Sequence, residues 1–171
     1  MSWRRTPKTS SESATTSNER ECADAQAALA AAVALLARRD FPSEELRAKL
    51  RAKGFGEDTA AVVIADLTSQ AVLNDERYAQ NYVAYHAQRG EGPIRIAAEL
   101  RRRGLTAGTV AAALAGGPDW GELARHVRRT RFGTLLPQSW ALKARQARFL
   151  QYRGFSADHI RTATGADSDV D

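Results

Sequence analysis

The 171-residue sequence has few large apolar side chains and a single cysteine, Cys22. Leu, Ile, Val and Phe together number 32, which is under one fifth of the chain and close to the range of disordered proteins. Val and Ile number only 12, so residues that pack well in strands are scarce. These shortages argue against a thick β-sandwich or barrel, and one cysteine excludes an intrachain disulfide framework and a multi-cysteine metal site.

Signals for membranes and for catalysis are also missing. No run approaches the roughly 18 apolar residues that a membrane span needs, and the N-terminal arginines precede no apolar segment typical of a signal peptide. We therefore expect a soluble, cytoplasmic chain. The histidines, His86, His126 and His159, fall on three different predicted helices, and there is no nucleophile elbow or phosphate-binding loop. We expect no enzyme activity, no metal and no cofactor.

Alanine and arginine are what the chain has in abundance. The 33 alanines, with Leu, Arg and Glu, favour helices. Arginine outnumbers lysine by 21 to 4, and the formal net charge is +5. Guanidinium groups bind phosphate and carboxylate in a planar fork, which points to an anionic partner. A GC-rich gene would favour the same residue types, so composition alone does not establish an anionic partner.

The positive charge is concentrated in residues 119–157, which carry a net +6. Between Glu122 and Asp158 there is no carboxylate. This pattern is typical of a surface that binds a polyanion, although a solvated helix face is the alternative. The candidate binding residues are the cations of this segment and three arginines at the end of an earlier helix: Arg125, Arg128, Arg129, Arg131, Lys143, Arg145, Arg148, Arg153, Arg101, Arg102 and Arg103.

An internal repeat of 50 residues runs through the sequence. Leucine and glycine recur four residues apart in the strings LRAKGF, LRRRGL and LQYRGF, which end at residues 55, 105 and 155. A basic residue, a glycine and a large apolar residue in this order predict a helix that ends in a left-handed glycine. The glycines are Gly54, Gly104 and Gly154.

Each glycine is followed at once by a signal for another helix. Thr106 and Ser156 are expected N-caps, and Asn74 is expected to cap an earlier helix. With breaks at residues 40–43, 90–93 and 133–138, each repeat becomes a three-helix unit.

We therefore predict an all-α protein of three tandem three-helix modules, elongated, with hinges near residues 73 and 117. The predicted segments are a disordered tail over 1–23, modules over 24–73, 74–117 and 118–165, and an acidic tail over 166–171.

Aromatic residues are few. Tyr78, Tyr82 and Tyr85 share one helical face, a stripe that favours core packing over a platform for bases. Trp120 and Trp140 flank the helices of the third module and are expected to anchor its packing.

The central block resembles the RecX regulatory proteins of bacteria. The matching features are the segment NDERYA from Asn74, with Asp75, Arg77 and Tyr78, and the turn formed by Gly90, Gly92 and Pro93; the repeated ends at Gly54, Gly104 and Gly154 complete them. The resemblance covers about residues 33–165.

The resemblance implies a curved fold of tandem three-helix modules and a non-catalytic role. We expect the chain to be a monomer. RecX proteins bind the RecA recombinase filament and modulate, usually inhibit, its ATPase, strand exchange and filament growth in recombination and DNA repair. The implied partners are the RecA filament and single- or double-stranded DNA. A direct nucleic-acid-binding helical module and a passive helical scaffold remain the alternatives.

Overall fold

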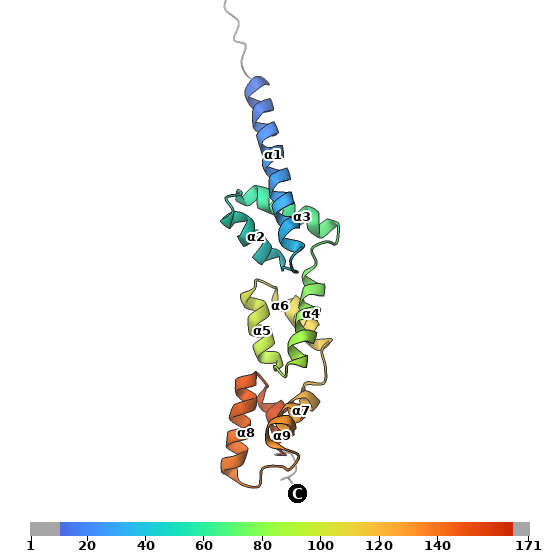
Figure 1. The fold of residues 1–171 in the computed structure, drawn as a ribbon, viewed down its shortest axis with the longest axis vertical. Helices are drawn as coiled ribbons and strands as arrows, with labels where there is room; N and C mark the ends of the chain where they lie inside the picture. The colour runs from blue at the N-terminus through green and yellow to red at the C-terminus, as the bar shows by residue number, and fades with distance from the viewer. Residues whose placement is uncertain (1–10, 166–171) are drawn as a thin grey trace, which may run out of the picture. The chain divides into compact units, whose positions relative to one another are not determined.

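The computed structural model describes the backbone of residues 11–165 and the side chains of residues 20–165. Within that range all regular secondary structure is α-helical, in nine helices that follow one another along the chain (Figure 1). The prediction of an all-α protein is confirmed.

The first module consists of α1 (Ser11–Leu36), α2 (Ser43–Ala52) and α3 (Glu57–Ser69). The mobile tail expected over residues 1–23 is helical from Ser11 onward, while residues 1–10 and 166–171 lie outside the described residues. Extending a helix that is already nucleated by packing costs little, which accounts for the helical residues before the packed part of α1. The module has its own core, formed by Ala28, Ala32, Phe41, Leu46, Leu50, Ala60, Val63, Ile64, Leu67 and Leu73.

The next six helices repeat this plan twice. They are α4 (Asp75–Gln88), α5 (Pro93–Arg102), α6 (Ala107–Ala115), α7 (Trp120–Phe132), α8 (Trp140–Arg153) and α9 (Ala157–Thr164). The second module, α4–α6, is centred on Val83, Ile96, Leu100 and Val110, and the third, α7–α9, on Val127, Leu150 and Phe155. The predicted three-helix repeat is thus present with three separate cores.

The glycine signature ends a helix in each module as predicted. Gly54, Gly104 and Gly154 all have left-handed φ angles, of 98°, 90° and 93°. After each glycine, the N–H of the apolar residue donates to the carbonyl of the leucine five residues earlier, at 3.1–3.3 Å. This is the hydrogen bond of a Schellman motif, and it turns the chain directly into the next helix.

The expected N-caps are confirmed as well. The Asn74 side-chain oxygen accepts a hydrogen bond from the Arg77 N–H at 2.8 Å. Thr106 and Ser156 cap α6 and α9 in the same way. Pro93 occupies the first turn of α5, where a missing N–H costs nothing.

The second and third modules are joined by main-chain hydrogen bonds. The Gly92 N–H donates to the Arg153 carbonyl at 2.8 Å, and the Ile94 N–H donates to the Gly154 carbonyl at 3.0 Å. The two glycines allow this approach, since a Cβ on Gly92 would lie 2.3 Å from the carbonyl carbon of Gly154. Residues Met1–Leu73 and Asn74–Asp171 form two compact units, and the hinge expected near residue 117 is bridged within the second.

Candidate interaction surface

The four arginines of α7 divide into buried, paired and exposed side chains. Arg128 is only 3 % exposed, and its guanidinium donates to the carbonyl oxygens of Leu135 and Thr134 at 2.8 and 3.2 Å. Burial lowers the pKa of Arg128 from its ordinary value, with a smaller contribution from the positive charge of Arg129. Arg128 therefore holds the loop after α7 and does not belong to a binding surface, contrary to the expectation from sequence.

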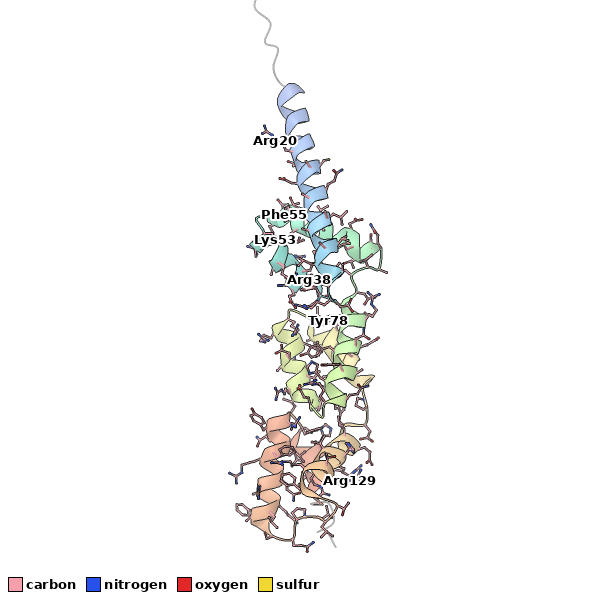
Figure 2. All side chains as sticks on the ribbon, in the orientation of Figure 1. Arg20, Arg38, Lys53, Phe55, Tyr78 and Arg129 are labelled. Atoms are coloured by element: carbon pink, nitrogen blue, oxygen red, sulfur yellow. The ribbon has the colours of Figure 1, made fainter. Side chains whose placement is uncertain are left out.

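The helical periodicity of α7 explains this burial. Ala124 and Val127 are buried core residues, and position 128 completes their i, i+3, i+4 stripe. Arg125 is partly covered and pairs with Glu122, with nitrogen and oxygen 2.6 Å apart. This contact lowers the pKa of Glu122 and raises that of Arg125. Arg129 and Arg131 remain exposed, and Figure 2 shows Arg129 on α7.

The outer face of α8 combines cations with an aromatic ring. Arg145, Arg148 and Tyr152 follow one another at spacings of three and four residues, so they share one helical face. All three are exposed, Tyr152 by 80 %. Lys143 is partly buried on the same helix.

The two tryptophans do not anchor the third module. Trp140 is 83 % exposed, whereas Trp120 packs against the core of the second module and donates from Nε1 to the Leu114 carbonyl at 3.3 Å. The third module is instead centred on aliphatic residues and on Phe155. Both expectations for the tryptophans were therefore wrong, and Trp140 adds a second aromatic ring to the exposed surface of α8.

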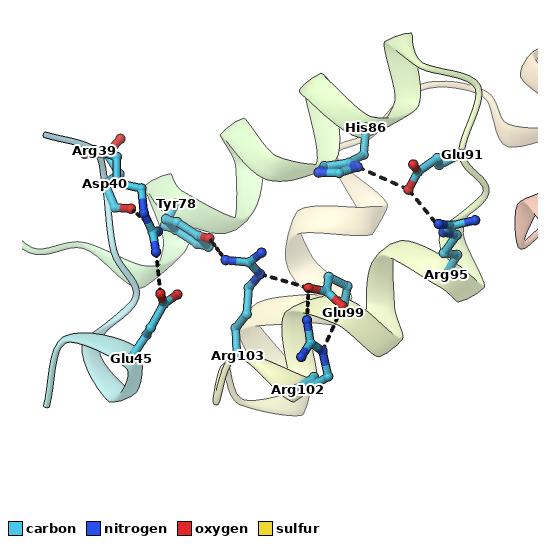
Figure 3. A network of polar contacts seen from close by, with 10 residues as sticks. All are labelled: Arg39, Asp40, Glu45, Tyr78, His86, Glu91, Arg95, Glu99, Arg102 and Arg103. Atoms are coloured by element: carbon cyan, nitrogen blue, oxygen red, sulfur yellow. Dashed lines mark hydrogen bonds and ion pairs between the residues drawn. The ribbon is translucent and has the colours of Figure 1, made fainter. Parts of the chain in front are cut away.

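The arginines at the end of α5 mostly form ion pairs within that helix end, and one of them also reaches α4. Arg102 and Arg103 both bind the Glu99 carboxylate, at 2.6 and 3.3 Å, and Arg103 also donates to the Tyr78 hydroxyl at 3.0 Å (Figure 3). The hydrogen bond from Arg102, followed by the charges of both arginines, lowers the pKa of Glu99. Arg101 and Arg102 are exposed, and Arg103 is partly buried.

The tyrosine stripe of α4 is mostly a packing surface. Tyr78 and Tyr82 lie against the core of the second module, with ring centroids 6.1 Å apart. The pKa of Tyr82 is raised by burial, which the nearby Arg103 partly opposes. Tyr85 is 55 % exposed, and the Arg89 guanidinium lies over its ring, 5.4 Å from the ring centroid.

A pocket of about 240 Å³ lies where the second and third modules meet. Three arginines from different segments line it: Arg89 after α4, Arg131 on α7 and Arg153 at the end of α8. The remaining lining residues are Gln88, Gly90, His126, Val127, Thr130 and Phe149. Sequence reasoning missed Arg89 and His126, because Arg89 lies outside the carboxylate-free segment and His126 was weighed only as a metal ligand.

Two kinds of site are absent from the part of the chain that the structure describes. Among residues 20–165, whose side chains the structure describes, no three His, Cys, Asp or Glu side chains are grouped so that they could hold a metal ion. None of the described helices combines the length and apolar character needed to cross a bilayer.

Each of the three modules matches a known protein-domain family. The models described as the first, second and third three-helix domains of RecX match residues 28–67, 74–114 and 121–164. The regulatory protein RecX of Halorhodospira halophila is 40 % identical over 142 residues, covering 82 % of this chain and 88 % of that protein. The RecX of Stenotrophomonas maltophilia is 41 % identical over 139 residues, covering 81 % and 85 %.

Solved structures agree on the fold. The crystal structure of RecX from Lactobacillus salivarius superposes with a TM-score of 0.76 at 23 % identity, covering 87 % of this chain and 99 % of that one. A second crystal structure of a regulatory protein RecX also has a TM-score of 0.76, at 18 % identity, with coverage of 94 % and 81 %. With three matched domains in order and about 40 % identity to curated relatives, the chain belongs to the RecX family of non-catalytic regulatory proteins, modulators of the RecA recombinase.

Proposed function

We propose that this chain binds the RecA filament as a monomer in the cytoplasm and inhibits its ATPase, strand exchange and growth during recombination and DNA repair. Membership of the RecX family is the observation that carries the proposal. Inhibition then results from occupancy: the bound chain takes space that a second DNA or an incoming RecA subunit requires.

The surface of the third module supports a polyanionic partner. After the buried Arg128 and the paired Arg125 are set aside, Arg129, Arg131, Arg145 and Arg148 remain exposed on α7 and α8. No carboxylate lies between Glu122 and Asp158 to neutralise them. A RecA filament on DNA offers both acidic side chains and phosphates, and opposite charge accelerates the association.

Direct DNA binding is the second candidate, favoured by the exposed rings of α8. Tyr152 lies on the same face as Arg145 and Arg148, and a ring beside cations is the combination that binds single strands by stacking and charge. In this case the chain would bind naked DNA, and the affinity would fall steeply with salt.

Co-sedimentation with RecA filaments preassembled on single-stranded DNA tests the leading proposal. The parent chain should pellet with the filaments, and Arg145→Glu/Arg148→Glu should reduce the bound fraction because two exposed contacts become repulsive. Arg20→Glu/Arg38→Glu is the matched control, since it makes the same change in charge at exposed positions on α1 and in the turn that follows it (Figure 2). A parent chain that stays in the supernatant at micromolar concentrations contradicts the proposal.

A further inference from the structure

The pocket at the junction of the second and third modules brings together arginines from three segments of the chain. Arg89, Arg131 and Arg153 line a volume of about 240 Å³ from three sides. The His126 ring adds a nitrogen that can donate a hydrogen bond, while the Thr130 hydroxyl already donates to the His126 carbonyl at 3.0 Å. These donors come together only because the Gly92 and Gly154 main chains lie in contact, which draws the end of α8 toward the end of α4.

Two of the three arginines are held in place by neighbours. Arg153 donates from Nη1 to the Arg89 carbonyl at 3.2 Å, and its guanidinium lies 5.5 Å from the Phe149 ring centroid. The Arg89 side chain donates to the Tyr85 hydroxyl at 3.0 Å. Each of these bonds uses one of the five N–H groups of a guanidinium, so others are available to a ligand. Such bracing reduces the side-chain entropy that binding would cost.

The pocket contains no compensating acid. None of the lining residues carries a carboxylate, within the portion of the chain that the structure covers. The neighbouring acid in sequence, Glu91, is bound by His86 at 3.1 Å and by Arg95 at 3.5 Å (Figure 3). The lining therefore keeps its full positive charge toward solvent.

The arrangement of the donors favours phosphate over carboxylate. A carboxylate is planar, and one guanidinium satisfies it with two parallel hydrogen bonds. Three guanidinium groups that converge from separate segments suit a tetrahedral group that accepts from several directions. Gly90 keeps the pocket open, since its missing Cβ would lie 2.9 Å from a Val127 methyl and 4.0 Å from Nη1 of Arg153.

The basic face of α8 begins one helical turn from the pocket. Phe149 lines the pocket, and Arg145 lies one helical turn before it on the same side of the helix. A nucleic-acid strand with one phosphate in the pocket can therefore extend along Arg145, Arg148 and Tyr152. A free phosphate ion would gain nothing from this second surface.

We propose that the pocket lined by Arg89, Arg131 and Arg153 binds a backbone phosphate of single-stranded DNA. The inference deepens the proposed function, on which it rests, by naming DNA phosphate as a ligand of the basic surface. It assigns the binding to a junction between modules, whereas the candidate residues from sequence lie along helices.

Fluorescence anisotropy with a labelled oligothymidine tests this site without RecA. The variant is Arg89→Gln/Arg131→Gln, which changes two exposed side chains and leaves the junction hydrogen bonds in place. At about 50 mM salt its affinity should fall by about tenfold or more, and the slope of log affinity against log salt should become shallower by about 0.7, the value for one lost phosphate contact on a single strand. Arg20→Gln/Arg38→Gln should match the parent in both quantities.

A second probe separates phosphate from other features of the strand. An oligothymidine with uncharged methylphosphonate linkages should bind the parent and the pocket variant equally weakly. Equal affinity and salt slope of parent and pocket variant for the charged strand would overturn the proposal. If the pocket variant loses only RecA filament binding, the occupant is an acidic protein surface, and the phosphate assignment is wrong while the proposed function stands. If the parent binds the strand through the pocket but does not bind filaments, the proposed function fails and the pocket stands.

Discussion

At the scale of single residues, glycine does more than end helices in this chain. Gly92 has an ordinary extended conformation, with φ of −86° and ψ of 165°, so conformational strain does not require a glycine there. The requirement comes from the neighbouring module, because an added Cβ would lie 2.3 Å from both the carbonyl carbon and the carbonyl oxygen of Gly154. Two glycines 62 positions apart thus create the junction that carries the phosphate pocket.

The variant Gly92→Ala should therefore open this junction. Overpacking against the main chain is expected to cost about 1–3 kcal/mol of unfolding free energy, measured by urea titration. The amide of Ile94, whose bond to the Gly154 carbonyl depends on the contact, should exchange with solvent faster than in the parent.

Gly56→Ala is the matched control for this substitution. Gly56 is also an N-cap glycine in extended conformation, with φ of −63°, but its nearest neighbour would be the Thr59 hydroxyl at 3.9 Å. It should cost less than about 1 kcal/mol, the usual range for an N-cap change. If Gly92→Ala and Gly56→Ala lower the unfolding free energy equally, the close approach of Gly92 and Gly154 does not determine the junction.

A second residue-scale prediction concerns Glu99, whose pKa is lowered in the folded chain, first by its hydrogen bond from Arg102. Because the folded state favours the ionised form, the carboxylate adds stability above its ordinary pKa of 4.5, and this is lost as the pH falls below that value. Glu99→Gln should be less stable than the parent near pH 7, by about 1 kcal/mol or less, and this difference should shrink as the pH falls below 4.5.

Urea titrations near pH 7 and near pH 3 provide the measurement. Glu76→Gln, which removes an exposed carboxylate from the same helix bundle, should follow the parent at both. A Glu99→Gln variant that stays below the parent by the same margin near pH 3 would exclude the electrostatic explanation.

At the scale of helices and loops, neighbouring arginines on α7 have different tasks. Arg128 is buried and holds the carbonyls of Thr134 and Leu135, whereas Arg129 is exposed. Arg128→Gln should lower the unfolding free energy by about 1–3 kcal/mol, because a shorter amide leaves buried acceptors without donors. It should also speed proteolysis in the loop after α7, while Arg129→Gln should behave like the parent in both assays. The same stability for both variants would contradict the structural role of Arg128.

Helix boundaries were predictable because they depend on local chemistry. The Asn74 cap, the Thr106 cap and the left-handed Gly104 each follow from a few adjacent residues, and the structure confirms all three. The start of α1 at Ser11 was not predicted, since its polar residues have little to bury and a tail was expected. Propagation from the packed part of a helix needs no burial of its own, so local composition was a poor guide there.

At the scale of the whole molecule, the sequence analysis located the positive charge but not the pocket. The carboxylate-free segment identifies the third module as basic. It does not separate the buried Arg128 from the exposed Arg129, because a run of charged residues does not show which side chains face the core. The core stripe through Ala124 and Val127 contained the missing signal. No local pattern could bring Arg89 to Arg153, because their contact depends on how the second and third modules pack.

We propose that this chain inhibits the RecA filament through the basic surface of its third module, and one assay tests this directly. The direct measurement is ATP hydrolysis by RecA filaments preassembled on single-stranded DNA, titrated with the parent chain, Arg145→Glu/Arg148→Glu and Arg20→Glu/Arg38→Glu. We predict that ATP turnover falls as the parent is added. Arg145→Glu/Arg148→Glu should need about tenfold more protein for the same inhibition, which corresponds to roughly 1.4 kcal/mol of binding free energy. Arg20→Glu/Arg38→Glu should match the parent. Unchanged ATP turnover at saturating concentrations of the parent chain, or equal inhibition by Arg145→Glu/Arg148→Glu, would contradict this proposal.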